Sequence, residues 1–141
     1  MEDFTEKMRR AAERNAFTVY NHIDVLSVTT EKSVVKLDIN PQSKNPYGMV
    51  HGGALYSMAD NAAGFLVSTD RRKHVTQSGN LHFLGNQSEG TIFATARIRH
   101  RGKKTALVTV DITGDNDKLL ATGEFTFFCV DSAPLNIPEK E

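Results

Sequence analysis

One stretch of the chain sets its architecture: Asn45-Pro-Tyr-Gly-Met-Val-His51-Gly52-Gly53-Ala-Leu-Tyr-Ser-Met-Ala-Asp60-Asn61-Ala-Ala-Gly-Phe-Leu-Val67. A turn-forming segment delivers a histidine and two glycines to the start of a helix that we predict over residues 54–68. That helix is apolar nearly all round, which is typical of a helix covered on several sides. Asp60 stands in its middle, where a carboxylate is rarely buried without a partner or a role.

Strand patterns dominate the rest of the chain. Two β-branched runs at 23–30 and 33–40, separated by Glu31 and Lys32, predict a hairpin. After a charged break at 70–73 we predict four more strands at 74–84, 91–101, 105–114 and 119–130, because turn-like segments separate them. A short surface helix is predicted over 4–15, a loop over 41–47 and a loose tail from Asp131. The predicted class is α+β: one long helix wrapped by a curved antiparallel sheet of about six strands.

Composition restricts the classes of function. A chain of 141 residues is expected to form a single domain, 1–141, with a core that needs neither disulfides nor metal. Seventeen basic residues balance seventeen acidic ones, so nothing indicates binding to nucleic acid or to an anionic membrane. The single cysteine, Cys129, fits a reducing compartment. Since there is also no signal-peptide pattern and no long apolar run, we expect a soluble cytoplasmic protein without a membrane partner.

The order of the predicted elements resembles the hotdog fold. Within it, Asn45-x-x-Gly48-x-x-His51-Gly52-Gly53 followed by Asp60 resembles the phenylacetate-pathway-type (PaaI-like) acyl-CoA thioesterases. The resemblance runs over about 17–130, and the helix motif is its specific part. It implies hydrolysis of an acyl-CoA thioester by a homo-oligomer of dimers joined edge to edge through their sheets, which we expect to be a dimer of dimers (homotetramer). It implies no metal and no cofactor.

Gly52 and Asp60 are the first candidate catalytic residues. The first N–H groups of a helix lack intrahelical acceptors and favour developing negative charge, and a glycine lets a substrate carbonyl approach closely. Asp60 is the candidate base or nucleophile, and the sequence leaves activation of water and direct attack both open. The alternatives are that Gly52 and Gly53 only make a tight turn, and that Asp60 is exposed or caps a second helix beginning at Asn61.

The resemblance assigns supporting roles around them. His51 is expected to orient the loop or Asn45 so that the Gly52 N–H points correctly, and Asn45 matches the family position that helps bind the carbonyl or water. The alternative for Asn45 is a turn residue before Pro46. Thr76 falls where relatives place a hydroxyl that positions the water, with Ser78 as the neighbouring alternative.

Substrate binding is expected in two places. Gly48 and Gly53 belong to the matching loop. The basic turn Arg101-Gly102-Lys103-Lys104 lies, in resembling proteins, near the phosphates of CoA, although such turns are often only solvated. The candidate residues for an acyl pocket are Met49, Tyr56, Phe65 and Leu84, and the alternative is that they are core residues.

Helical geometry adds a constraint that does not depend on the resemblance. His51 and Asp60 are nine residues apart, which at 100° and 1.5 Å per residue places them half a turn and roughly 13 Å apart. One helix therefore does not bring Asp60 to a carbonyl held at Gly52, whereas two antiparallel copies do. A shared active site at a dimer interface follows. The competing functions are a non-catalytic acyl-CoA-binding module, and a hydratase or dehydratase, whose motifs are spaced differently.

Overall fold

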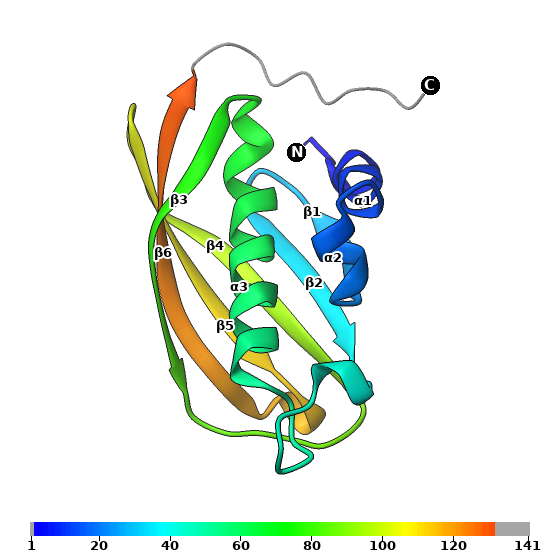
Figure 1. Ribbon diagram of the computed structural model, residues 1–141. Coiled ribbons are helices and arrows are strands. Elements are labelled where there is room, and N and C mark those ends of the chain that lie inside the picture. Colours follow the sequence, from blue (N-terminus) through cyan, green and yellow to red (C-terminus); the bar gives the residue numbers. More distant parts are fainter. Residues whose placement is uncertain (1, 132–141) are drawn as a thin grey trace.

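The computed structural model describes residues 2–131. A six-stranded antiparallel sheet curves around one long helix, α3 (Gly52–Val67), as Figure 1 shows. The strands are β1 (Ile23–Val28), β2 (Lys32–Asp38), β3 (Lys73–Phe83), β4 (Thr91–Arg101), β5 (Thr105–Thr113) and β6 (Leu119–Asp131). Their order across the sheet is β1-β2-β4-β5-β6-β3, so β1 and β3 form its two edges. The predicted α+β class and hotdog architecture are confirmed.

The apolar character of α3 has a direct structural reason. Its Ala54, Leu55, Met58 and Ala59 are buried, and so are its Ala62, Ala63, Leu66 and Val67. These side chains pack on the alternating inward-facing residues of the strands, for example Val35, Ala94 and Val108. Alternation along β4 buries Ile92, Ala94 and Ala96 and leaves the residues between them more exposed, as the sequence pattern predicts.

The predicted boundaries need a few corrections. The helix begins two residues earlier than predicted, because His51 accepts the Gly53 N–H and caps it at Gly52. The predicted loop at 41–47 contains a 3-10 turn, Pro41–Ser43, and short 3-10 turns also occupy Ser68–Asp70 and Asp115–Asp117. Asp131 is the last residue of β6 rather than the start of a tail, and residues 132–141 lie outside the described part of the chain.

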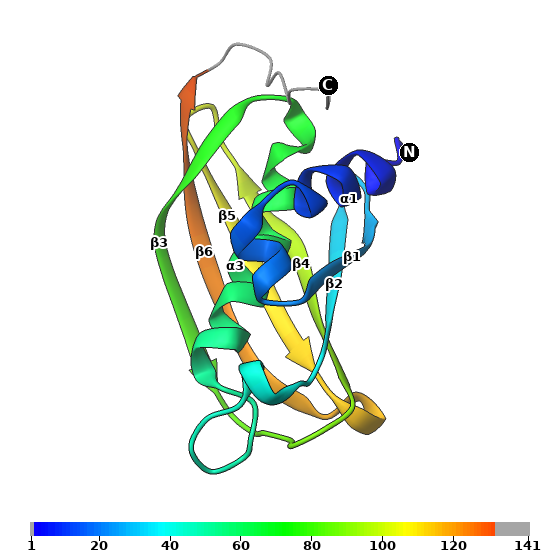
Figure 2. The same ribbon diagram turned by 45° about the vertical axis from the view of Figure 1, so that its right-hand side comes forward.

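The N-terminal region is two helices rather than one. α1 (Thr5–Glu13) ends before Asn15, whose side chain accepts the Thr18 N–H and begins α2 (Ala16–Tyr20). Figures 1 and 2 show both helices beside β1, next to the half of α3 that is nearer its C-terminus. The Thr18 hydroxyl is 3.2 Å from the Asn61 side-chain oxygen, so α2 is tied to α3 one residue from Asp60.

No helix among the described residues is long and apolar enough to cross a membrane.

Candidate active site

The loop before α3 is a closely bonded turn. The Asn45 side-chain oxygen accepts the N–H groups of Tyr47 and Met49, at 2.9 and 3.1 Å. Gly48 between them has φ of +78°, a conformation that glycine adopts without strain. The side-chain oxygen of Asn45 therefore stabilises the turn, as the alternative of a turn residue before Pro46 predicts. Its side-chain nitrogen has no hydrogen-bond partner within residues 2–131.

His51 fixes the start of the helix. Its Nδ1 accepts the Gly53 N–H at 2.8 Å, and its own N–H donates to the Ser43 carbonyl at 2.7 Å. Since Nδ1 is an acceptor, the neutral ring carries its proton on Nε2. His51 thus contacts Gly53 rather than Asn45 and holds the first turn of α3 in place.

The Gly52 N–H is the open donor at this end of the helix. As the first residue of α3 it has no intrahelical acceptor, and it makes no hydrogen bond within residues 2–131. A Cβ placed on Gly52 would lie 3.4 Å from the Phe83 ring at the end of β3. Phe83 therefore forms a wall beside the donor, a contact that no sequence spacing indicated.

Asp60 and Thr76 meet in one chain. The Thr76 hydroxyl donates to Asp60 Oδ1 at 2.7 Å, from β3 to the middle of α3. Asp60 is half-buried and Thr76 is exposed. This contact places Thr76, rather than Ser78, beside the carboxylate, and the register of β3 against β6 shifts between these two residues. One oxygen of Asp60 is thus bound by a hydroxyl, while Oδ2 is left for another proton or atom.

Gly52 and Asp60 stay apart in the single chain. They are eight residues apart on α3, about 12 Å at 1.5 Å per residue. The loop residues Asn45, Gly48 and His51 gather at the start of α3, whereas Asp60 and Thr76 lie halfway along it. The described chain therefore holds these candidate residues in two separate groups.

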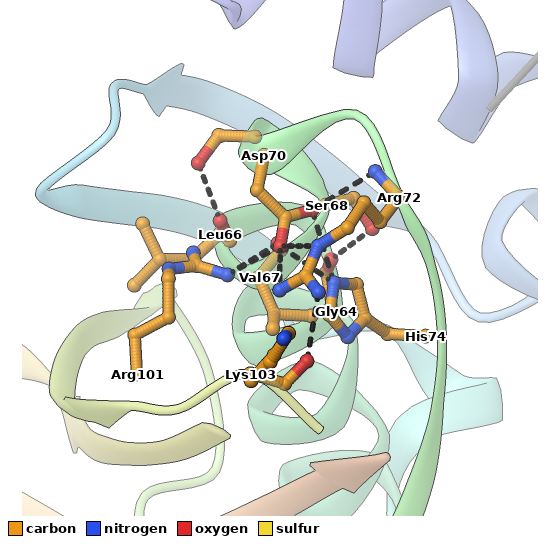
Figure 3. A network of polar contacts seen from close by, with 10 residues as sticks. Gly64, Leu66, Val67, Ser68, Asp70, Arg72, His74, Arg101 and Lys103 are labelled. Atoms are coloured by element: carbon orange, nitrogen blue, oxygen red, sulfur yellow. Dashed lines mark hydrogen bonds and ion pairs between the residues drawn. The ribbon is translucent and has the colours of Figure 1, made fainter. Parts of the chain in front are cut away.

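The basic turn is part of a network at the far end of α3, shown in Figure 3. Arg101 Nη1 donates to the Val67 carbonyl at 3.1 Å and to Asp70 at 2.9 Å. Arg72 donates to Asp70 and, through Nη1, to the Lys103 carbonyl. Arg101 thus anchors the turn to the helix, while the side chains of Lys103 and Lys104 are exposed and Gly102 closes the turn on Thr105.

Asp70 is the centre of this network. Burial alone would raise its pKa, but hydrogen bonds from the Arg72 N–H, the His74 ring and the Arg72 side chain outweigh burial and lower the pKa. The side chain of His74 is 2% exposed, and its Nε2 lies 3.0 and 2.9 Å from the two Asp70 oxygens. Its Nδ1 is buried without a partner in the described chain. Sequence reasoning missed this network because it joins two stretches that are distant in the chain, 67–74 and 101–103.

Two cavities adjoin the N-terminal helices. The larger, about 720 Å³, lies between α1, α2, β1 and β2 and contains none of the predicted site residues. The smaller, about 340 Å³, lies between α1, α3 and β3 and is lined by Asp60 and Thr76. Of the predicted acyl-pocket residues only Phe65 lines it, whereas Met49, Tyr56 and Leu84 do not.

Comparison with known proteins places this geometry in a family. The model of the thioesterase superfamily matches residues 47–121, more than half of the chain. The acyl-coenzyme A thioesterase PaaI of Escherichia coli is 29% identical over 123 residues, covering 81% of this chain and 88% of the relative. The 1,4-dihydroxy-2-naphthoyl-CoA hydrolase of Listeria monocytogenes is 30% identical, covering 74% and 87%. The solved structure of the E. coli PaaI protein superposes with a TM-score of 0.82 at 26% identity, over 90% of this chain and 96% of that one.

The match begins in the turn before α3 and continues into β6, so it contains the basic turn and all of these candidate residues except Asn45. The PaaI-like resemblance noted from the motif is confirmed by these relatives. The chain belongs to the thioesterase superfamily and is a thioester hydrolase built on the hotdog fold.

Proposed function

We propose that the protein hydrolyses acyl-CoA thioesters in active sites shared between two subunits, with Gly52 of one subunit and Asp60 of the other. The observation that carries the proposal is the pair of half-sites on α3: an open N–H donor at Gly52, and a carboxylate bound by Thr76 eight residues later. The relatives named for acyl-CoA hydrolysis support the choice of substrate class.

The free edge of β3 supports assembly through this strand. All eleven residues of β3 are exposed or partly exposed except Leu81, and the outer edge of the strand is unpaired in the sheet. A long exposed edge strand tends to pair with another strand. Antiparallel pairing of two β3 edges would set two α3 helices side by side in opposite directions, so that the Asp60 region of one lies near the Gly52 region of the other. Pairing of such dimers into a tetramer, and a cytoplasmic location, are further parts of the proposal.

The chemistry follows from the two half-sites. The Gly52 N–H donates to the thioester carbonyl oxygen and stabilises the negative charge that develops there. Asp60 Oδ2 takes a proton from a water that attacks the carbonyl carbon, while Thr76 holds Oδ1 and so orients the carboxylate. Collapse of the tetrahedral intermediate breaks the carbon–sulfur bond, and the proton returns to the departing CoA thiolate. Direct attack by Asp60, giving a mixed anhydride that water then hydrolyses, uses the same groups.

The remaining predicted residues have positions that suit binding. His51 holds the first turn of α3, Gly48 and Gly53 shape the loop, and the Asn45 nitrogen is able to donate to the carbonyl or the water. Lys103 and Lys104 are the exposed cations suited to CoA phosphates. Arg101 and Gly102 fix the turn that presents them.

The test is release of free thiol from a panel of acyl-CoAs by the wild type and by Asp60→Ala. We expect the rate of the variant to fall about a thousandfold, with its melting temperature within a few degrees of the wild type. Equal rates for the two proteins would exclude the role of Asp60. Failure of the wild type to hydrolyse any member of the panel would favour a binding module instead.

Complementation tests the shared site. Asp60→Ala and Gly52→Pro each disable a different half-site, so mixing the two inactive variants under conditions of subunit exchange should form heterodimers with one intact site. Partial recovery of activity is the expected result. No recovery, with exchange verified by a labelled subunit, would contradict the shared site.

A further inference from the structure

The cavity of about 340 Å³ beside Asp60 has a reactive region and an apolar region. Asp60 and Thr76 form the reactive region. The side chains of Met8, Phe65 and Phe127 form much of the rest. Most polar groups in the wall are bonded to the protein itself: Asn61 to Thr18 and Ser57, Ser68 to Gly64, and His74 Nε2 to Asp70. The space next to the carboxylate therefore suits an apolar group.

Gly64 keeps this cavity open from the side of α3. It lies in the interior of the helix, where a glycine is less favourable than an alanine. Neither its backbone nor its surroundings require a glycine: its φ is not positive, and a Cβ would meet only the Phe127 ring, at 3.9 Å. The missing side chain leaves space at the cavity one helical turn from Asp60, as expected where a ligand must fit.

The opposite wall is α1. Met8 and Ala11 line the cavity and, three residues apart, share one face of the helix. The helix is fixed to the edge of the sheet by the Phe4 N–H, 2.9 Å from the Val28 carbonyl, and by Arg9, which reaches the Val25 carbonyl at 3.4 Å. A wall held in this way keeps a constant distance from α3.

We propose that α1 forms the outer wall of the acyl site, and that Met8 and Ala11 opposite Gly64 set the length of the acyl group that the enzyme accepts. This inference rests on the proposed acyl-CoA hydrolysis. It assigns the acyl group to the subunit that supplies Asp60, and it gives the N-terminal helix a role in specificity.

The first experiment changes the wall at Ala11. Ala11→Leu adds roughly three carbon atoms to the cavity side of α1. Because one methylene in an apolar pocket changes kcat/KM by about tenfold or more, activity against the longer members of a series from acetyl- to dodecanoyl-CoA should fall at least tenfold relative to the shortest. The matched control is Glu13→Leu, which adds a leucine to the same helix where it lines the larger cavity instead. The control should keep the wild-type length profile.

The second experiment changes the opposite wall. Gly64→Ala should raise the melting temperature, because alanine favours the helix, and should still lower activity on long relative to short acyl groups. A variant that lost activity by unfolding would melt at a lower temperature. A higher melting temperature together with a shorter preferred acyl group therefore points to the cavity. Met8→Ala should shift the optimum toward longer chains, measured on protein that melts cooperatively.

The outcomes separate the two levels of the proposal. Hydrolysis with the same length profile in the wild type, Ala11→Leu and Gly64→Ala would overturn the role of α1 and leave acyl-CoA hydrolysis standing. Failure of the wild type to hydrolyse any thioester in the series would overturn the proposed function and this inference with it.

Discussion

At the start of α3 the Gly52 N–H has no acceptor within residues 2–131, whereas beyond its last residue, Val67, polar groups gather in a dense network. There, Arg72, His74 and Arg101 converge on Asp70, and Arg101 also holds the Val67 carbonyl. The backbone groups at the two ends of α3 therefore differ: the Gly52 N–H makes no hydrogen bond within residues 2–131, whereas the Val67 carbonyl accepts one from Arg101. A satisfied end fixes the helix in the sheet, and an open end is free to bind a substrate atom.

The strongest way to test the open end is to remove its donor. Gly52→Pro deletes the N–H but suits the first position of a helix, and the extended conformation of His51 (φ −70°, ψ 137°) suits a residue before proline. We expect thioesterase kcat to fall by about a hundredfold to a thousandfold. The control, Gly52→Ala, keeps the donor and should retain far more activity. Equal losses in the two variants would show that the donor is not used.

At the other end of α3, changes to the Asp70 network should alter the free energy of unfolding instead. Asp70→Asn removes the charge that Arg72 and Arg101 share, and should lower the free energy of unfolding by about 2–3 kcal/mol at pH 7, measured in urea. Because the native pKa of Asp70 is lowered, its stabilisation is complete above the unfolded-state value of 3.8 and is lost as pH falls through the lower native pKa. The difference between wild type and variant should therefore shrink in acid. A difference that stays constant down to pH 2 would contradict this assignment.

A smaller effect on the rate is expected at the carboxylate between the two ends. Thr76→Val removes the hydroxyl bonded to Asp60 Oδ1 and keeps the shape of the side chain. We expect kcat to fall about tenfold. Thr76→Ser, which keeps the hydroxyl, should retain most of the activity. A serine variant as impaired as the valine variant would point to packing rather than hydrogen bonding.

The smallest expected effect is at the helix cap. His51→Ala removes the Nδ1 acceptor from the Gly53 N–H and should destabilise the protein by about 1 kcal/mol. His51→Asn should recover most of this loss, because asparagine is a favoured residue at this position. Urea unfolding of both variants measures the difference. Identical stability of the alanine variant and the wild type would show that the His51 cap does not stabilise the protein.

The sequence was sufficient for most of the fold because its signals were local. The apolar run after Gly53 predicted α3, and the β-branched runs between turns predicted all six strands. The break between α1 and α2 was missed because Asn15, which caps the second helix, lies inside a continuous helical pattern. The resemblance pointed to a hydroxyl at Thr76 or Ser78 but not to its contact with Asp60, and the register shift between these two residues of β3 has no mark in the sequence.

By itself, the sequence determined an apolar helix that carries Asp60 and begins close to Gly52. Helical spacing alone keeps Gly52 and Asp60 apart, because both properties depend on residues near one another in the chain. Only the tertiary structure decided what each end of that helix meets. The packing of β3 brings Phe83 to Gly52 and Thr76 to Asp60. The end of β4 brings Arg101 to Asp70, and α1 lines a cavity together with Gly64. These contacts join residues that are distant in the chain. Which of them meet depends on how the sheet curves around α3, and local sequence patterns do not encode that curvature.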